Sequence, residues 1–542
     1  MSTPTQTERQ ETAAPAIELK GISKAFGPVQ ANKDISIRVM PGTIHGIIGE
    51  NGAGKSTLMS ILYGFYKADK GDIFIAGKKT DIPDSQAAIA AGIGMVFQHF
   101  KLVENFTVLE NIILGAEDGR LLKPSLAKAR KSLLKLADDY GLKVDPDALV
   151  QDIGVGMQQR VEILKALYRQ ADILILDEPT GVLTPAEADQ LFRILGRLRS
   201  EGKTIILITH KLREIMETTD TVSVMRRGQM TATVKTAETS PAELAELMVG
   251  RKVLLRVDKK PAAPGPVILD VEGLRVVDEK GVERLRGIDL QVRAGEILGV
   301  AGVAGNGQSE LLEVLGGYRT GKGSVRVNGT ALDLTGNKSD GQSRRNHGIA
   351  HVPEDRQREG LIMDYQAWEN TAFGYHKDPA YRSGLLMDNA AIKADTVEKM
   401  ERFDVRPPNP KLAAKNFSGG NQQKIVLARE IERNPDLLLI GQPTRGVDIG
   451  AIEFIHEQIV ALRDQGKAIL LVSVELEEIL ALSDRVAVMF DGQVMGIRDA
   501  SKTDEKELGL LMAGITDTDA PHSIEEIEDN LAHAGGDPHK EV

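Results

Sequence analysis

A glycine-rich segment near the N-terminus has the residue types and spacing of a loop that binds phosphate groups. It reads G-x-x-x-x-G-K-S and consists of Gly49, Glu50, Asn51, Gly52, Ala53, Gly54, Lys55 and Ser56, followed by Thr57. An apolar run precedes it and residues with helical spacing follow, which is the context that such a loop requires. The glycines let backbone N–H groups converge on phosphate oxygens at a helix N-terminus. Lys55 supplies a cation to the terminal phosphates, and the Ser56 hydroxyl can ligate Mg²⁺. The alternative is a chance glycine turn.

Three further polar residues follow apolar runs and have types suited to phosphate chemistry. Asp177 and Glu178 follow the run 171–176, and His210 follows the run 204–208. The first carboxylate can hold the water shell of a metal ion, and the second is placed to polarise an attacking water. The histidine can contact a γ-phosphate. The alternatives are an acidic pair that caps a surface turn and a structural histidine. With the phosphate loop upstream, the pattern favours nucleotide hydrolysis.

The sequence repeats itself. Three segments of the first half return in order in the second half, at offsets of 253, 264 and 264 residues: 46–57 as 299–310, 155–167 as 419–431, and 174–184 as 438–448. Two homologous halves of roughly 235–250 residues are therefore predicted. The expected organisation is a disordered N-terminal tail, a first domain, a Pro/Ala linker, a second domain and an acidic C-terminal tail, at 1–15, 16–250, 251–265, 266–516 and 517–542. Short buried strands, with a helical lobe at 104–170, predict an α/β fold for each half.

Composition narrows the function classes. The formal net charge is −11, which disfavours a broad nucleic-acid-binding surface, and no nucleic acid partner is expected. The chain contains no cysteine, so thiol catalysis and cysteine-ligated metals are excluded and a reducing compartment is compatible. No run approaches 18 apolar residues. If the protein works at a membrane, we expect other subunits to cross it.

The motifs together resemble the ATP-binding subunits of ABC transporters, over about 16–515. The segments that carry the resemblance are GENGAGKS, Gln98 after GIGMVF, VGMQQRVEILKAL, ILILDEPT and His210. The resemblance implies two tandem nucleotide-binding domains, each a P-loop core with a helical subdomain, with ATP and Mg²⁺ as cofactors. It also assigns roles: Lys55 and Ser56 as Walker A residues, Gln98 as the Q-loop, Asp177 and Glu178 as the Walker B pair, His210 as the switch histidine, and Phe26 as the aromatic that stacks on adenine. The implied metal ligands are Ser56, Gln98 and Asp177, and the catalytic residues are Glu178, His210 and Gln98.

The second half departs from this pattern at its own nucleotide site. Five residues are replaced there: Lys55 by Gln308, Gln98 by Glu354, Asp177 by Gly441, Glu178 by Gln442 and His210 by Val474. The glycines Gly302, Gly305 and Gly307 and the serine Ser309 remain. This degenerate second site is expected to lack hydrolysis, whereas its ability to bind nucleotide stays open.

The signature segment shows the opposite asymmetry. The second half has Ser418, Gly419 and Gly420, with Asp448 in the D-loop, whereas the first half has Gly154 and Thr184 in the serine and aspartate positions. ABC subunits are known to pack head to tail, so the resemblance implies one complete site, which combines the first-half residues with Ser418, Gly419, Gly420 and Asp448. Random decay of a redundant copy is the alternative.

The resemblance points to an importer. Fused pairs of this kind occur in importers of nucleosides and simple sugars and in ATPases that act at the ribosome. The degenerate second site, short linker and acidic tail favour the importer. The segments GVAGNGQSEL and VPEDR are similar to those of the nucleoside branch, with pentose or hexose as the alternative solute. The implied partners are two integral-membrane permease subunits and, indirectly, an extracytoplasmic solute-binding protein. The implied location is peripheral, on the cytoplasmic face of the inner membrane.

Overall fold

The computed structural model describes residues 14–27, 29–97, 100–116, 122–180, 183, 185–252, 259–303, 305–335, 340–384, 386–447 and 449–515. The predicted C-terminal tail and all but two residues of the predicted N-terminal tail lie outside these ranges. Within the described ranges, the chain divides into two compact units, one up to residue 252 and one from 259 to 515. The division falls inside the predicted linker. Each unit has its own buried apolar core.

A six-stranded sheet forms the centre of the first unit, in the order β10-β9-β3-β8-β7-β6. Its strands are β3 (Ile44–Gly49), β6 (Ile93–Val96), β7 (Ile173–Asp177), β8 (Thr204–Ile208), β9 (Thr221–Arg226) and β10 (Gln229–Lys235). Every residue of β3, β6, β7 and β8 is buried, as expected of parallel strands that are covered on both faces. In the parallel register, Gly46 and Leu176 both lie opposite Leu207. The carboxyl ends of β3, β7 and β8 therefore meet at one edge, where ligands bind in such sheets.

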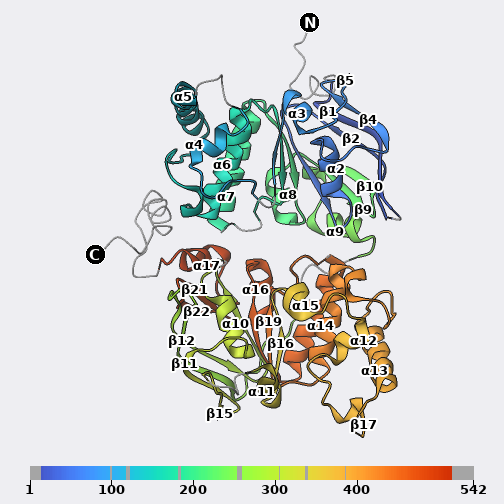
Figure 1. Cartoon of the computed structure of the whole chain (residues 1–542), viewed down its shortest axis with the longest axis vertical. Helices are drawn as coiled ribbons and strands as arrows, with labels where there is room; N and C mark the ends of the chain where they lie inside the picture. The colour runs from blue at the N-terminus through green and yellow to red at the C-terminus, as the bar shows by residue number, and fades with distance from the viewer. Residues whose placement is uncertain are drawn as a thin grey trace, which may run out of the picture. The chain divides into compact units, whose positions relative to one another are not determined.

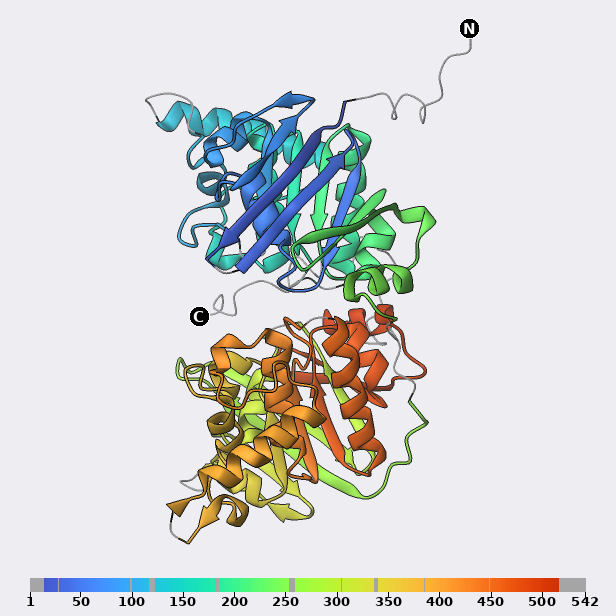
Figure 2. The ribbon, with the colours of Figure 1, turned by 90° about the vertical axis from the view of Figure 1, so that its right-hand side faces the viewer.

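A second, antiparallel sheet of the first unit has the order β2-β1-β4-β5. Its strands are β1 (Ile17–Phe26), β2 (Val29–Val39), β4 (Lys70–Ile75) and β5 (Lys78–Lys79). Figure 2 shows β1 and β2 running side by side across this unit. Alternate residues of β2, namely Ile35, Ile37 and Val39, are buried in the same core as Leu58 of helix α2 (Lys55–Leu62). This sheet therefore backs the helix that carries the phosphate loop.

Helices complete the first unit. They are α3 (Ser85–Ala90), α4 (Val108–Ile113), α5 (Leu122–Tyr140), α6 (Val155–Tyr168), α7 (Pro185–Ser200), α8 (Leu212–Thr218) and α9 (Pro241–Val249). Helices α4, α5 and α6 gather at one side of the unit, opposite β1, β2 and β4 (Figure 1). The helical lobe that the sequence predicts at 104–170 is confirmed.

The second unit repeats this topology. Its sheets have the orders β16-β19-β20-β13-β21-β22 and β12-β11-β14-β15. The strands are β11 (Val267–Val277), β12 (Glu283–Arg293), β13 (Glu296–Ala301), β14 (Lys322–Val327), β15 (Thr330–Ala331), β16 (Ile349–Val352), β19 (Leu437–Gly441), β20 (Ala468–Val472), β21 (Arg485–Phe490) and β22 (Gln493–Asp499). The helices are α10 (Gln308–Gly316), α11 (Gly341–Asn346), α12 (Ala367–Ala372), α13 (Asn389–Arg402), α14 (Gly419–Ile431), α15 (Ile449–Asp464), α16 (Leu476–Leu482) and α17 (Glu505–Met512). A small hairpin, β17 (Arg382–Ser383) and β18 (Leu386–Met387), precedes α13.

The described part of the predicted linker contacts the second unit. Lys259 Nζ donates to Leu482 O at 3.0 Å and lies 3.4 Å from Asp484 Oδ1. Arg463 Nη2 donates to Lys260 O at 2.9 Å. Residues 259–265 are thus attached to the second unit, a contact that their Pro/Ala composition does not reveal. Among the described residues, the structure contains no helix long and apolar enough to cross a membrane.

His45 is a buried titratable residue and the second residue of β3. Its side chain is 2% exposed, and its Nε2 lies 2.9 Å from the Ser223 hydroxyl. Burial lowers the pKa of His45 to about 4. The unfolded chain has an ordinary histidine pKa, so it takes up the proton first as the pH falls. In the second unit, the corresponding residue Leu298 is apolar and buried.

We expect His45→Leu to make folding less sensitive to acid. Between the ordinary histidine pKa and about 4, protonation of the unfolded chain lowers the wild-type free energy of unfolding by up to about 3 kcal/mol. The variant lacks this loss, and urea unfolding midpoints across that pH range measure it. His376→Leu, at an exposed histidine, is the control. An equal loss of midpoint in His45→Leu and in the wild type would contradict the assignment.

Candidate nucleotide-binding site

The phosphate loop joins the carboxyl end of β3 to the N-terminus of α2. Gly49 is the last residue of β3, and Lys55 is the first residue of α2. Between them, Gly52 and Gly54 have φ values of 81° and 96°, in the left-handed region that glycine adopts without strain. This turn directs backbone N–H groups at the start of the helix towards a bound anion. Ser56 and Thr57 follow in the first turn of α2.

Close packing behind the loop leaves no room for side chains at two of its glycines. A Cβ at Gly49 would lie 2.3 Å from Met225 O, and a Cβ at Gly54 would lie 2.2 Å from Ala31 O. The fully buried Asn32 donates its Nδ2 to Gly54 O at 3.0 Å. Strands β2 and β9 therefore fix the position of the loop. Asn32 is a positioning residue that sequence reasoning missed, because a lone asparagine in a strand carries no recognisable signal.

The Lys55 ammonium lies against the backbone of the loop. It is 6% exposed, and its Nζ donates to Gly49 O at 2.6 Å and to Glu50 O at 3.1 Å. Burial lowers the pKa of Lys55, while the negative charges of Glu178, Asp177 and Glu50 oppose that shift. The lysine therefore sits at the loop with its charge near the carboxylates at the end of β7 and after β3.

Asp177 and Ser56 meet at the start of α2. Asp177 is 8% exposed, and burial together with the adjacent Glu178 charge raises its pKa to about 6. The Lys55 charge and a hydrogen bond with Ser56 act in the opposite direction. A hydroxyl and a carboxylate at one point are hard oxygen donors, which Mg²⁺ prefers, with waters and phosphate oxygens completing its shell. The donor set fits this ion.

Glu178 and His210 form a pair beside Asp177. Glu178 Oε1 lies 2.9 Å from His210 Nδ1. Burial raises the pKa of Glu178, but the hydrogen bond and charge of His210 and the charges of Lys55 and Lys211 outweigh it, so the net pKa is lowered. An ionised carboxylate is the form that accepts a proton from water. Glu178 has a φ of 47°, and its N–H donates to Ile208 O at 2.8 Å, which turns its side chain out of the strand end.

Phe26 is the last residue of β1. It is 42% exposed and packs edge-to-face against Tyr66, with ring centroids 5.1 Å apart. Lys24 Nζ lies 5.6 Å from the Phe26 ring centroid. An exposed aromatic ring that is already held by neighbours can accept a planar base at little cost in side-chain order.

The signature residues of the second unit start helix α14. Ser418 is its N-cap, with φ −63° and ψ 159°, and Asn421 Nδ2 donates to Ser418 Oγ at 2.8 Å. A Cβ at Gly419 would lie 2.6 Å from the Arg356 guanidinium, and Gly420 is buried. Arg356 also donates to Gly446 O at 3.2 Å. Arg356 therefore links the signature segment to the loop after β19, a role that the sequence did not indicate.

The second unit keeps the shape of the phosphate loop without its cation. Gly305 and Gly307 have φ values of 95° and 100°. A Cβ at Gly302 would lie 2.0 Å from the amide nitrogen of Gln308. Gln308 replaces the lysine, and its Nε2 donates to Val303 O at 3.1 Å.

At the end of β19, the Walker B position is also changed. Gln442 has the same φ of 47° as Glu178, but it carries an amide. Its Oε1 accepts a hydrogen bond from Val474 N at 3.3 Å. Gly441, which replaces the aspartate, ends β19.

The structure thus brings together five of the predicted residues in the first unit: Lys55, Ser56, Asp177, Glu178 and His210. Phe26 belongs to the same unit, and Ser418, Gly419 and Gly420 belong to the second. Gln98 and Asp448 lie outside the described residues, as does Thr184.

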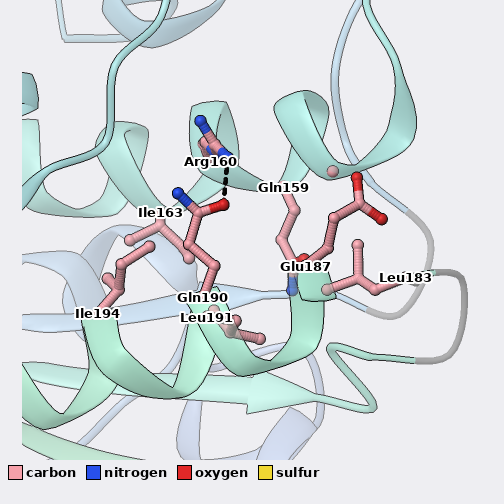
Figure 3. Close-up of a pocket in the computed structure, with 9 residues that line it drawn as sticks. Gln159, Arg160, Ile163, Leu183, Glu187, Gln190, Leu191 and Ile194 are labelled. Carbon is pink, nitrogen blue, oxygen red and sulfur yellow. Dashed lines mark hydrogen bonds between the residues drawn. The ribbon is translucent and has the colours of Figure 1, made fainter. Parts of the chain in front are cut away.

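A separate pocket of about 280 Å³ lies between α6 and α7 (Figure 3). Arg160 donates to Gln190 Oε1 at 2.5 Å in this pocket, and Gln159 donates to Pro179 O at 2.7 Å. Its other lining is mainly apolar, including Ile163 and Ile194. It holds none of the phosphate-loop residues, so it is distinct from the nucleotide site.

Comparison with known proteins shows which family has this architecture. The family model described as "ABC transporter" matches twice, at residues 32–181 and 285–445. Three relatives match over nearly their whole length. The nucleoside import ATP-binding protein NupA of Lactococcus lactis subsp. cremoris is 48% identical, over 92% of this chain and 98% of that protein. The guanosine import ATP-binding protein NupO of Bacillus subtilis is 48% identical, over 93% and 98%. The glucose import ATP-binding protein TsgD13 of Haloferax volcanii is 44% identical, over 94% and 98%.

The fold and the loop define a pair of fused ATP-binding cassettes. The chain belongs to the ABC transporter family. The predicted family and the α/β fold class, with a P-loop core and a helical subdomain in each half, are confirmed.

We expect Gly54→Ala to weaken nucleotide binding to the first unit by at least tenfold, because a methyl group collides with Ala31 O and the left-handed turn becomes strained. Equilibrium titration with a fluorescent ATP analogue measures this. Gly202→Ala is the matched control, since Gly202 also has a positive φ but no atom within 4 Å of its Cβ position. Unchanged binding in Gly54→Ala would show that the loop does not hold the phosphates.

Proposed function

We propose that this chain is the Mg²⁺-dependent ATPase subunit of an importer, with nucleosides as the solute class. The observation that carries the ATPase proposal is the cluster of Lys55, Ser56, Asp177, Glu178 and His210 at one sheet edge of the first unit. The solute class rests on similarity to the nucleoside and guanosine import proteins. Import of a simple sugar is the second candidate, favoured by the glucose import protein. A soluble ATPase that acts at the ribosome is a weaker alternative.

In the proposed reaction, Phe26 stacks on adenine, while the loop backbone and Lys55 hold the terminal phosphates. Ser56, Asp177 and Gln98 would hold a Mg²⁺ ion, which would supply positive charge to the terminal phosphates. Glu178 orients the attacking water and accepts its proton, for which its lowered pKa is suited. His210 holds the Glu178 carboxylate through their 2.9 Å contact and lies beside the γ-phosphate position.

We expect Glu178→Gln to lower the ATPase rate by about 10² to 10⁴ while ATP binding persists, because an amide cannot accept the proton. Steady-state phosphate release by the membrane-assembled complex measures this. Gln442→Asn, at the same backbone position in the other unit, is the matched control and should retain most activity.

In membrane vesicles, Glu178→Gln should also abolish ATP-driven uptake of a labelled nucleoside. Retention of more than about a tenth of the ATPase rate would refute the role of Glu178. Uptake of ribose or glucose in place of the nucleoside would favour the sugar alternative.

We further propose that the complete ATP site is shared head to tail. Ser418 and the helix N-terminus at Gly419 and Gly420 contact the γ-phosphate held by the first unit, and Asp448 belongs to the same site. This proposal is supported by the serine of the signature segment, which the second unit keeps and the first unit lacks. Ser418 and Gly154 have the same backbone, with φ −63° and −62° at the two helix starts, but only Ser418 has a hydroxyl. A hydroxyl and a helix N-terminus stabilise developing negative charge on a phosphate.

We expect Ser418→Ala to lower the ATPase rate by about 10² to 10³, since loss of such a donor costs about 2.7 to 4 kcal/mol. Gly154→Ala is the matched control. A Cβ at Gly154 has no atom within 4 Å in the structure, so that variant should fold and stay active. ATPase assays of both variants decide the matter. Equal sensitivity at the two positions would refute one-site asymmetry, and loss only in Gly154→Ala would refute the crossed arrangement.

The proposed partners are two integral-membrane permease subunits and, indirectly, an extracytoplasmic solute-binding protein, with the chain at the cytoplasmic face of the inner membrane. A groove in the first unit supports a docking site. Its aromatic lining consists of Tyr63, Phe65 and Phe97, which contact one another at ring-centroid distances of 5.4 to 5.9 Å. Lys101 and Arg169 add positive charge to the lining. These features suit a short amphipathic helix.

The segment 100–111 borders this groove and is held by hydrogen bonds within the segment and to α6. Asn111 Oδ1 accepts from Val103 N at 2.7 Å, and Lys101 N donates to Glu162 Oε1 at 2.8 Å. Leu102 packs against the helical core of the first unit, while Phe106 is half-buried. The segment therefore serves both packing and, in our proposal, docking.

We expect Lys101→Cys to crosslink to a co-expressed permease. The chain has no cysteine of its own, so the introduced thiol is unique. Lys33→Cys, at an exposed position in β2, is the control and should not crosslink. Mass spectrometry of the crosslinked complex identifies the partner segment. Equal crosslinking at both positions, or none at Lys101→Cys in a folded complex, would contradict docking at this groove.

A further inference from the structure

The second unit has a carboxylate side chain in the space of its missing aspartate. Gly441 occupies the position of Asp177, and a Cβ there would lie 2.5 Å from Cγ of Glu354 and 3.2 Å from its backbone nitrogen. Glu354 follows β16, where the first half of the sequence has Gln98 after β6. The side chain of Glu354 therefore fills the space beside Gly441.

Glu354 also takes over the hydrogen bond that the aspartate makes in the first unit. Ser309 Oγ donates to Glu354 Oε2 at 2.6 Å. Ser309 is the second residue of α10, as Ser56 is the second residue of α2, and Ser56 hydrogen-bonds to Asp177. Each unit thus pairs a hydroxyl with a carboxylate at the start of its loop helix. The carboxylate comes from β7 in the first unit and from the segment after β16 in the second.

The loop around this pair retains an open phosphate cradle. A Cβ at Gly305 would have no atom within 4 Å, and the φ values of Gly305 and Gly307 match those of the first loop. Gln308, however, is neutral. A phosphate in this cradle therefore meets the negative charge of Glu354 without a lysine to offset it, and two like charges a few ångströms apart repel by several kcal/mol at the dielectric of a protein surface. A divalent cation between the phosphate and the Glu354 carboxylate attracts both groups and so overcomes this repulsion.

We propose that Ser309 and Glu354 hold a divalent cation on the phosphates of a nucleotide that the second unit binds without hydrolysing. This inference rests on the proposed function, because it takes the loops of both units as nucleotide sites. Hydrolysis is absent because the Gln442 amide accepts no proton and its oxygen is engaged by Val474 N. The cation is obligatory for binding here, whereas the first loop has Lys55 as a second source of positive charge.

The test counts bound cations in the full chain. Mn²⁺ replaces Mg²⁺, a non-hydrolysable ATP analogue is added, and electron paramagnetic resonance measures the Mn²⁺ bound per chain. The wild type should bind two ions. Glu354→Ala and Ser309→Ala should each bind one, and so should Ser56→Ala, which removes one of the proposed ligands in the first unit. Glu359→Ala, at an exposed carboxylate five positions along the chain from Glu354, is the matched control and should bind two.

Two results would overturn the inference. One is that Glu354→Ala and Ser309→Ala both keep two ions, which would reduce the Ser309–Glu354 contact to a structural hydrogen bond. The other is that the wild type binds a single ion that Ser56→Ala removes. If instead Ser56→Ala keeps two ions while Glu354→Ala loses one, the metal site proposed for the first unit fails and the one in the second unit stands.

Discussion

The site depends on one backbone constraint, a left-handed glycine immediately before a buried helix. At Gly54 and Gly307 the chain turns with φ values of 96° and 100°, and packing behind each turn excludes a side chain: the obstacle is Ala31 O in the first unit, and Arg284 O at 2.8 Å in the second. Only glycine meets both conditions. The turn places helix N–H groups where a phosphate binds, independently of any side-chain chemistry. This explains how one unit can lose its cation and its base while its loop keeps its shape.

At the ends of β7 and β19, too, the two units share a backbone conformation but differ in the reactive side chain. Glu178 and Gln442 share a φ of 47°, which is uncommon for a residue with a side chain and costs about 1 to 3 kcal/mol. Each is held by a hydrogen bond of 2.8 Å to the neighbouring strand, from Glu178 N to Ile208 O and from Gln442 N to Val472 O. The strain is therefore supported by the sheet in both units. Replacing the carboxylate with an amide leaves the sheet unchanged, so the second unit keeps the geometry of a catalytic strand end without its reactive group.

Sequence reasoning predicted features that local pattern determines. The phosphate loop, the buried strands and the helical lobe all follow from spacing within short windows, although β7 runs one residue further than the apolar run and includes Asp177. Contacts between distant residues were not predictable. Asn32 supports Gly54 from 22 positions away, and Glu354 reaches Ser309 across 45. Such contacts depend on how strands are ordered in the sheet and on which way a side chain turns, and neither is encoded in the spacing of a motif. Sequence alignment of the two halves identified Glu354 only as a lost glutamine.

The carboxylate of Glu354 beside Ser309 changes how the loss of motif residues in the second unit is interpreted. Counted by motif, the second unit has lost a lysine, a glutamine, an aspartate, a glutamate and a histidine. Counted by the groups that surround the loop, it has lost a cation and a base, but a carboxylate from another strand faces the retained serine. Loss of turnover then does not entail loss of ligand. When the free nucleotide concentration is a hundred times the dissociation constant, binding raises the free energy of unfolding of the unit by about 2.7 kcal/mol. This is a large fraction of the net stability of a typical domain. A loop that no longer hydrolyses would, on this argument, still be retained because the unit around it is more stable with its ligand than without.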